Sequence, residues 1–372
     1  MPPRTEALRL AALAASLAAA VPSGCATLAD GTPGLDNPPT LRAGPFRLLK
    51  TGELGENRSP PNTVDDGNNR LRDPGALDVD GDPSTFDIEG YFAASVEDAA
   101  PEDPPARIAR LHATDGRSFD RNLEFVLEPD QPWEGGVVGA PSVILAGDPT
   151  DVEETPADEE RLLFYEGAGG IGLAHAAGAT GEFVKEAEPV LTAADVPWSS
   201  IPPKSPGAVR LPDGTFRLYF EARCGAESCI GVASSIDGVN FTDPVGGPVL
   251  RPDRDPTGLD SAYVGSPSAV VAESAESRAI VQVYFTGIDD NGKNAIRLAA
   301  RFADAPDEGL EKNGGAMFRP SGGVAPHEPV VVRFDAFTIF FATQKPGRTS
   351  TDVVVVAGVS PGDTTLPPAS TP

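Results

Sequence analysis

The sequence predicts an all-β protein, a five-bladed β-propeller with four-stranded antiparallel blades. Three observations predict this fold. The chain has 40 Gly and 39 Pro among 372 residues but few Met and Lys, a composition typical of short strands joined by turns. Its apolar segments are short and alternate with polar residues, as strands do. One ordered set of motifs also recurs five times at a nearly constant period.

The first motif of each repeat is a proline followed by small and then β-branched residues. It occurs as DPGALDV, APSVILA, SPGAVRL, SPSAVVA and EPVVVRF, with its proline at Pro74, Pro141, Pro206, Pro267 and Pro329. Successive prolines are 67, 65, 61 and 62 residues apart. A β-sandwich would also have short strands, but not one motif set at a constant period, so the repeat favours a propeller.

Three further strands are expected in each repeat. An aromatic-rich second strand follows the proline motif, as in RLLFYEG and TFRLYFEA, and a short alternating third strand comes next, as in GIGLAHAAG and CIGVASSIDG. A fourth piece ends the unit in NLEFVLEP, EAEPVLT and GGPVLRP. The fifth repeat has no convincing fourth strand after VVVVAGVS. We therefore expect the early segment PFRLLKTG to complete that blade and close the ring.

The N-terminus has the pattern of an export signal. Arg4 and Arg9 form a short basic region, and the apolar run LAALAASLAAAV is too short for a permanent membrane anchor. The following VPSGC resembles the lipobox of bacterial lipoproteins, which implies cleavage and lipidation at Cys25. Pro22 stands where that family usually has Leu, so an ordinary cleaved signal peptide remains the alternative. Ala26 after the cysteine favours the outer membrane or cell surface, with the domain on the periplasmic or extracellular side.

Four regions are expected along the chain. Residues 1–24 form the lipoprotein signal peptide, 25–69 a tether with the closing strand, 70–360 the propeller and 361–372 a disordered tail. Apart from Cys25, the only cysteines are Cys224 and Cys229 in EARCGAESCIG, which flank a glycine-containing turn. In an oxidising compartment they are expected to form a disulfide. With no second cysteine pair and three His, no zinc site is expected.

The charge of the chain limits its partners. A net charge of -26 without a basic cluster argues against a nucleic-acid partner and against docking on anionic lipid. We expect a monomer whose partner is a glycan or an envelope component and whose membrane contact is the lipid anchor. No cofactor is expected. Asp78, Asp80 and Asp82 in LDVDGDP resemble the start of a calcium loop, but without the later bidentate Glu a hairpin turn is favoured over a calcium ion.

The motif set resembles the five-bladed glycosidase-like propellers, namely glycoside hydrolase families 32, 43, 62, 68 and 130, over roughly residues 70–360. The likeness rests on the x-P-S/G-A/V blade start, the aromatic second strand in RLYFEA, and the turn SSIDGVNF echoed by HATDGRSF. It implies an axial funnel with catalytic carboxylates one or two residues before the motif prolines. Hydrolysis of a glycosidic bond needs two carboxyl groups, one as base or nucleophile and one as acid.

Only one of the three carboxylates implied by this resemblance is in place. Asp73 fits the base or nucleophile of the first blade, but Ala140 occupies the corresponding position of the second. In the third blade, Lys204 stands where the acid is expected. A lysine at its ordinary pKa is a poor acid for a sugar leaving group. Conventional hydrolysis of the family 32 or 43 type is therefore not expected.

Other polar side chains are expected near the funnel. Glu328 is the fifth-blade equivalent of Asp73 and is the candidate second catalytic carboxylate. The resemblance makes the neighbouring His327 a candidate for holding a central ion or water. Glu166 and Glu221 end the second strands of blades two and three, as binding residues or as charged strand ends in salt bridges. With Lys204, they complete the predicted binding set.

Two functions remain open. The first is an exported surface lipoprotein that binds carbohydrate or a surface partner through aromatic and polar side chains in the funnel, with little or no conventional hydrolase activity. The second is an active glycoside hydrolase or related glycan-processing enzyme using Asp73 with Glu328, Glu221 or Glu166. The missing carboxylates favour binding.

Overall fold

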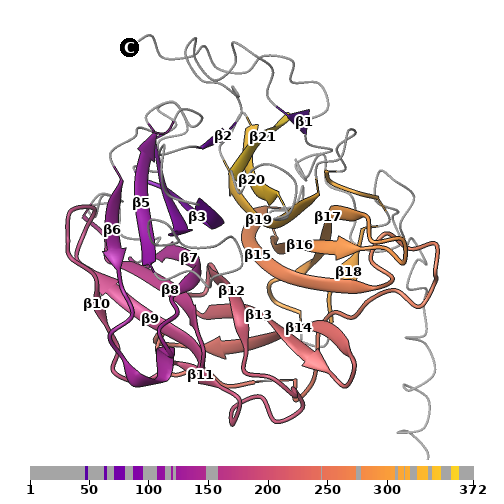
Figure 1. Ribbon diagram of the computed structural model, residues 1–372, viewed down its shortest axis with the longest axis horizontal. Coiled ribbons are helices and arrows are strands. Elements are labelled where there is room, and N and C mark those ends of the chain that lie inside the picture. The colour runs from indigo at the N-terminus through magenta and orange to yellow at the C-terminus, as the bar shows by residue number, and fades with distance from the viewer. Residues whose placement is uncertain are drawn as a thin grey trace, which may run out of the picture.

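Five antiparallel sheets surround a common axis in the computed structural model of this chain (Figure 1). The structure describes residues 47–48, 63–64, 71–79, 87–94, 107–113, 119, 123–147, 158–243, 245–273, 278–305, 309–313, 315–318, 325–333, 337–344 and 353–359. Each sheet begins with a strand that carries one of the repeated prolines, and these strands lie innermost. The sheets are the five blades of a β-propeller, which confirms the predicted fold class.

Blades one and two show how the repeat is built. Blade one contains β3 (Leu71–Asp78), β4 (Ile88–Ala94), β5 (Arg107–Ala113) and β6 (Glu124–Leu127). The 3-10 helix η1 (Pro132–Glu134) leads into blade two, which contains β7 (Gly139–Leu145), β8 (Arg161–Gly167), β9 (Gly170–Ala176), β10 (Val184–Lys185) and β11 (Leu191–Thr192). Both of its short outer strands, β10 and β11, pair with β9.

Blades three and four differ at their outer edge. Blade three contains β12 (Lys204–Arg210), β13 (Phe216–Cys224) and β14 (Glu227–Ser235). In place of a continuous fourth strand, β14 makes isolated bridges to Thr242 and Leu250. Blade four contains β15 (Tyr263–Glu273), β16 (Ala279–Ile288), β17 (Asn294–Phe302) and β18 (Glu311–Lys312). The expected four-stranded blade is therefore regular in blades one and four and modified elsewhere, always at the outer position.

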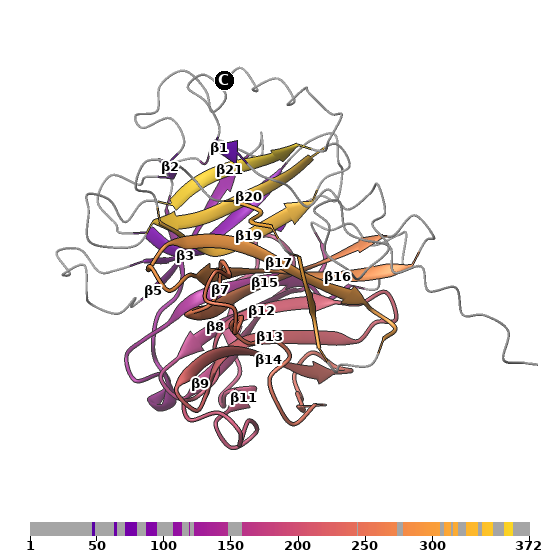
Figure 2. The same ribbon diagram turned by 90° about the vertical axis from the view of Figure 1, so that its right-hand side faces the viewer.

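Blade five joins the two ends of the described chain. It contains β19 (Pro326–Arg333), β20 (Phe337–Gln344) and β21 (Val353–Val359), together with β1 (Arg47–Leu48) and β2 (Thr63–Val64). β1 lies within the segment PFRLLKTG and pairs antiparallel with β21, as does β2 (Figure 2). The place of a fourth strand is thus filled from the N-terminal side of the chain. The inner strand β19 also contacts β3, so the ring of blades is closed.

Apolar side chains fill all five junctions between blades. Alternation along each strand directs one set of side chains to each face of its sheet, so every blade packs on both neighbours. The buried clusters include Leu77 and Val143 at the first junction, Phe164 and Phe216 at the second, Val209 and Val283 at the third, Tyr284 and Val331 at the fourth, and Phe92 and Val330 at the fifth. The core is therefore a ring of five interfaces rather than one central cluster.

Small residues after the motif prolines allow the inner strands to approach closely. A Cβ added at Gly75 would lie 2.6 Å from the carbonyl oxygen of Pro141 in the next blade. Gly207 lies similarly close to Pro267. In blade two the position is Ser142, whose hydroxyl accepts a hydrogen bond from the Ala208 amide at 2.9 Å. The small side chains of the motif thus bring neighbouring inner strands together around the axis.

Several sequence predictions concern residues near or outside the described part of the chain. The predicted disulfide between Cys224 and Cys229 is present and closes the β13–β14 hairpin. β3 ends at Asp78 and β4 begins at Ile88, so the two strands form a hairpin, while Asp80 and Asp82 lie outside the described residues. The signal peptide, Cys25, most of the tether and the tail after residue 359 lie outside them as well. Within the described residues, no helix has the length and apolar character needed to span a bilayer.

Candidate functional site

The residue before each motif proline has an unusual backbone conformation. All five have a positive φ between 43° and 53°, and the pairing register of the inner strand shifts at each of them. The five residues are Asp73, Ala140, Ser205, Ser266 and Glu328. A residue with a Cβ loses about 1–2 kcal/mol in the left-handed region. Because the bulge recurs in every blade, it is a property of the fold, and its cost is offset by contacts around the axis.

Three of these bulges are held by the neighbouring blade. In each case the N–H of the pre-proline residue donates to a side chain near the end of the previous blade's second strand. The bonds run from Ser205 to Glu166 Oε2 (3.0 Å), from Ser266 to Glu221 Oε2 (3.3 Å) and from Glu328 to Thr286 Oγ1 (2.9 Å). We call them the inter-blade latches. At the equivalent register position of blade one, Ala93 pairs with Arg72 and carries no acceptor.

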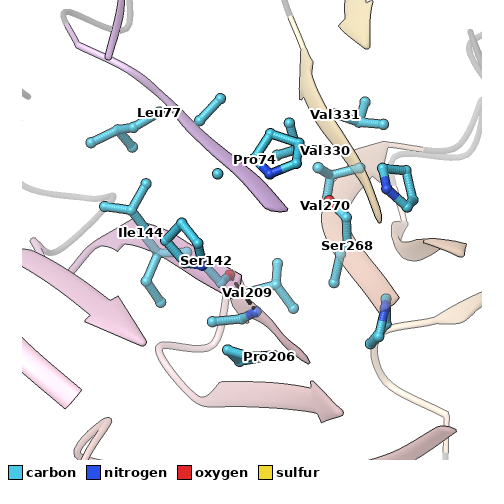
Figure 3. A pocket seen from close by; sticks show the side chains of 18 of the residues that line it. Pro74, Leu77, Ser142, Ile144, Pro206, Val209, Ser268, Val270, Val330 and Val331 are labelled. Carbon is cyan, nitrogen blue, oxygen red and sulfur yellow. Dashed lines mark hydrogen bonds between the residues drawn. The ribbon is translucent and has the colours of Figure 1, made fainter. Parts of the chain in front are cut away.

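The ring of prolines divides the axis into two parts. The five prolines and the five residues before them surround a constriction of about 30 Å³. Beyond it, along the inner strands, lies a cavity of about 340 Å³ lined mainly by proline, valine, leucine and isoleucine side chains (Figure 3). The lining residues of this cavity that the structure describes include no aromatic side chain. Polar groups instead gather at the other end, where the inner strands begin.

Two carboxyl groups meet at the start of the inner strands. Asp73 in blade one and Glu328 in blade five are hydrogen bonded to each other through their side chains. Burial, followed by the charge of Glu328 and this hydrogen bond, raises the pKa of Asp73 well above its usual value. His327 Nδ1 lies 2.9 Å from Glu328 Oε1. The arrangement is an interacting carboxyl pair, with the imidazole of His327 beside Glu328.

The interaction between Asp73 and Glu328 bears on whether the two carboxyl groups could hydrolyse a glycosidic bond. Glycosidases place their two carboxyl groups about 5–5.5 Å apart when they retain configuration and about 6.5–9.5 Å apart when they invert it. The charge of Glu328 and a hydrogen bond to its side chain both raise the pKa of Asp73, which indicates a closer approach than either arrangement. In this geometry they do not stand on opposite sides of a glycosidic bond.

Lys204 stands at the third-blade position where an acid was expected. Its Nζ lies 3.1 Å from Glu221 Oε1. Burial works to lower the pKa of Lys204, but the charges of Glu221 and Glu166 outweigh it and raise the pKa above its usual value. Lys204 is therefore an ammonium ion, and it neutralises carboxylates rather than acting as an acid.

Glu221 has polar partners on both carboxylate oxygens. Besides Lys204, its Oε1 accepts a hydrogen bond from Ser228 Oγ at 3.3 Å, while Oε2 accepts one from Tyr263 Oη at 2.6 Å in addition to the latch. Burial, then the charge of Glu221, raises the pKa of the Tyr263 hydroxyl well above its usual value. That hydroxyl remains a donor at neutral pH. The Glu221 side chain is only 5% exposed, so its main role is to hold the side chains that contact it in place.

Sequence reasoning missed Tyr263 and Ser228. Tyr263 begins β15 four residues before its motif proline, a position with no counterpart in the repeat. Ser228 lies next to Cys229 at the start of β14 and also donates to the Val264 carbonyl oxygen at 2.8 Å. The disulfide closes the hairpin that carries both Glu221 and Ser228. The cysteine spacing could have placed Ser228 near this site, whereas nothing in the repeat would have indicated Tyr263.

The residues brought together at this end of the axis form what we call the axial carboxyl site. Its members are Asp73, Glu166, Lys204, Glu221, Tyr263, His327 and Glu328. Their side chains differ in exposure, with 38% for Lys204, 24% for Glu328 and 17% for His327. Burial raises the pKa of Glu166, although the nearby Lys204 charge opposes this. The site thus offers carboxyl groups with raised pKa, carboxylate acceptors and a cationic donor to a ligand.

The site gives no support for a metal centre. Among the described residues, no group of three or more His, Cys, Asp or Glu side chains is arranged to hold a metal ion. His327 contacts Glu328, and its assignment to a central ion or water stays a prediction. The positioning of Glu166, Glu221 and Lys204 follows instead from hydrogen bonds between blades and from the Lys204–Glu221 ion pair within blade three.

Solved structures share this fold. A protein from Bacteroides thetaiotaomicron assigned as a glycosidase aligns with a TM-score of 0.59 at 14% identity, over 86% of this chain and 97% of that one. A thermostable family-43 glycoside hydrolase aligns with a TM-score of 0.55 at 17% identity, over 82% and 98%. A protein solved as a complex with RGII aligns with a TM-score of 0.59 at 13% identity, over 80% and 89%.

No model of a known protein family and no curated protein sequence matches the chain. At identities of 13–17%, the structural matches establish the fold and leave the activity to be argued from the site. The chain has the five-bladed β-propeller fold of glycosidase-like proteins.

Proposed function

We propose that this protein binds carbohydrate at the axial carboxyl site without conventional hydrolase activity. The observation that carries the proposal is the interaction between the carboxyl groups of Asp73 and Glu328, which raises the pKa of Asp73 and indicates a closer approach than the paired carboxyl groups of glycosidases have. Lys204 at the expected acid position, paired with Glu221, supports the same reading. The axis therefore keeps the polar groups of a glycan site but not the paired carboxylates of hydrolysis.

The polar groups of the site suit the hydroxyl groups of a sugar. Carboxylates accept hydrogen bonds from hydroxyls, and the Lys204 ammonium donates to them. Lys204 and Glu328 are partly exposed, with 38% and 24% of their side chains accessible. A ligand could therefore contact both side chains. Buried Glu221 holds Lys204 in place and accepts a hydrogen bond from Tyr263.

A second candidate function rests on the state of Asp73. Because burial and the Glu328 charge raise its pKa, Asp73 can keep a proton where an ordinary aspartate would not. A carboxyl group that holds its proton can act as a general acid, with Glu328 as the second carboxylate. This glycan-processing activity would require the two groups to separate when a substrate binds.

Glycan-array binding followed by product analysis tests both functions. We expect the wild type to bind a glycan saturably without releasing product, and Asp73→Ala to weaken binding about tenfold, since a charged or shared hydrogen bond is lost. Asp213→Ala is the matched control, because Asp213 lies in the turn between β12 and β13 at the opposite end of blade three and accepts hydrogen bonds from Thr215 there. Turnover that Asp73→Ala abolishes would favour the enzyme. Absence of glycan binding would contradict the proposal.

The proposal includes attachment to the cell envelope through Cys25. The apolar run and the VPSGC sequence support it, and they favour a propeller on the periplasmic or extracellular side of the outer membrane or at the cell surface. Lipidation would move the wild type into the detergent phase on Triton X-114 partitioning, and Cys25→Ala would return it to the aqueous phase. Equal partitioning of the two would rule out the anchor.

A further inference from the structure

The axial cavity beyond the proline ring is separate from the axial carboxyl site. Its volume is about 340 Å³, within the range of about 300–1,000 Å³ that small-ligand sites occupy. All five inner strands contribute to its wall, which includes Leu77, Ile144, Val209, Val270 and Val331 (Figure 3). The proline ring separates it from Asp73 and Glu328.

The wall of this cavity suits an amphipathic occupant. Most of its side chains are aliphatic, while Ser268, Asp78 and Arg210 add polar groups. The Ser142 hydroxyl already accepts the Ala208 amide of the next blade. An alkyl chain gains free energy from every methylene group that it removes from water.

One charged group on the wall has nitrogen atoms without an acceptor. Arg210 ends β12, six residues beyond Lys204 on the same strand and thus at the far end of the cavity. Its Nε and Nη1 atoms are buried and have no hydrogen-bond partner among the residues that the structure describes. Its guanidinium carbon lies 5.5 Å from the centre of the Phe216 ring. The other charged wall residue, Asp78, is engaged in an interaction of its own.

Buried guanidinium nitrogens without an acceptor are costly, so Nε and Nη1 of Arg210 are expected to bind a partner. The natural partner is an anion, since Arg matches the geometry of carboxylates. We propose that the axial cavity binds an amphipathic carboxylate, with its alkyl chain against the aliphatic side chains of the inner strands and its carboxylate on Arg210. This site is independent of the glycan function proposed above.

Binding of simple alkanoates to the full chain tests the proposal. Measured by calorimetry from butanoate to octanoate, the affinity should rise about fourfold with each added methylene group. Octanoate should bind at least about tenfold more tightly than the neutral octan-1-ol, because a charged hydrogen bond is made to Arg210. Acetate, which has almost no chain, should not bind measurably.

Two variants separate the chain from the head group. Arg210→Met should abolish the preference for octanoate over octanol while keeping the dependence on chain length. Val270→Trp should fill the cavity and abolish binding of both, with a cooperative thermal transition showing that the variant is folded. Arg223→Met is the matched control, because Arg223 is an exposed arginine beyond Glu221 at the opposite end of blade three.

Three results would overturn the inference. They are a wild type that does not bind octanoate, a folded Val270→Trp variant that binds it as tightly as the wild type, and an Arg210→Met variant that keeps the full preference for octanoate over octanol. A loss of that preference in Arg223→Met would point to a general charge effect and would also overturn it.

Discussion

At the scale of single residues, closure of the ring decides which side chains meet. Asp73 and Glu328 occupy the same position of the first and last repeats, and β19 contacts β3. The other three pre-proline residues are Ala140, Ser205 and Ser266, so the junction between blades five and one is the one that brings two pre-proline carboxyl groups together. Their interaction is therefore a consequence of which two repeats are joined when the ring closes.

Stability should depend on pH through Asp73. Its pKa is raised by folding, so the stabilisation that it contributes is complete below the ordinary value of 3.8 and is lost as the pH rises through the folded-state pKa. Asp73→Asn removes this titration. Relative to that variant, the free energy of unfolding of the wild type should fall as the pH is raised above 3.8. Chemical denaturation at a series of pH values measures the difference.

Asp237→Asn is the control for this experiment. Hydrogen bonds from the side chain and backbone of Asn240, and from Ser235 and Val239, lower the pKa of Asp237 below its usual value. Its contribution is present above pH 3.8 and is lost only as the pH falls below that, so the difference between Asp237→Asn and the wild type should be flat in the range where Asp73→Asn changes. The same flat profile for Asp73→Asn would contradict the raised pKa of Asp73.

At the scale of strands, the inter-blade latches connect the second strand of one blade to the first strand of the next. The repeat explains why the acceptors align, since Glu166, Glu221 and Thr286 all pair with the residue two before a motif proline. Each latch satisfies an N–H group that the bulge removes from the regular ladder. The latches thus hold the left-handed residues in place where the regular pairing of their own strand is interrupted.

Thr286→Val should cost about 1–3 kcal/mol of unfolding free energy, because it keeps the side-chain shape but leaves the Glu328 N–H without its acceptor. Thr286 is only 2% exposed, so water cannot easily replace the hydroxyl. Denaturant titration measures the loss. Thr257→Val is the matched control, since the Thr257 hydroxyl bonds to Asp255 in an exposed turn and its removal should cost much less. Equal costs for the two variants would show that this latch does not stabilise the fold.

The strands themselves were largely predictable, and the latches were not. Alternation in RLYFEA and IGVASS placed β13 and β14, and the proline motif placed all five inner strands. Glu166 and Glu221 were recognised as charged strand ends, but Thr286 was not, because a threonine near a strand end carries no signal of its own. Which N–H group donates a hydrogen bond to Thr286 depends on the angle between two blades. The sequence of one repeat does not determine that angle.

At the scale of the whole molecule, the period of about sixty residues predicted the number of blades and their order. It predicted the outer edges less well. Blade two has two short outer strands on β9, and blade three has only isolated bridges to Thr242 and Leu250 among the described residues. Outer strands pack on one neighbour only and face solvent, so their sequences are less constrained. The repeat is therefore clearest at the axis and weakest at the rim.

Removal of the N-terminal closing strands should destabilise the ring. A chain starting at residue 70 lacks β1 and β2, which pair with β21 through Arg47, Leu48, Thr63 and Val64. Losing these backbone hydrogen bonds should lower the free energy of unfolding by about 2–4 kcal/mol, and the unpaired edge of β21 should promote association. Denaturant titration and light scattering measure the two effects. A chain starting at residue 45 keeps both strands and is the control. Equal stability and equal mass for the two chains would show that blade five does not need the N-terminal segment for closure.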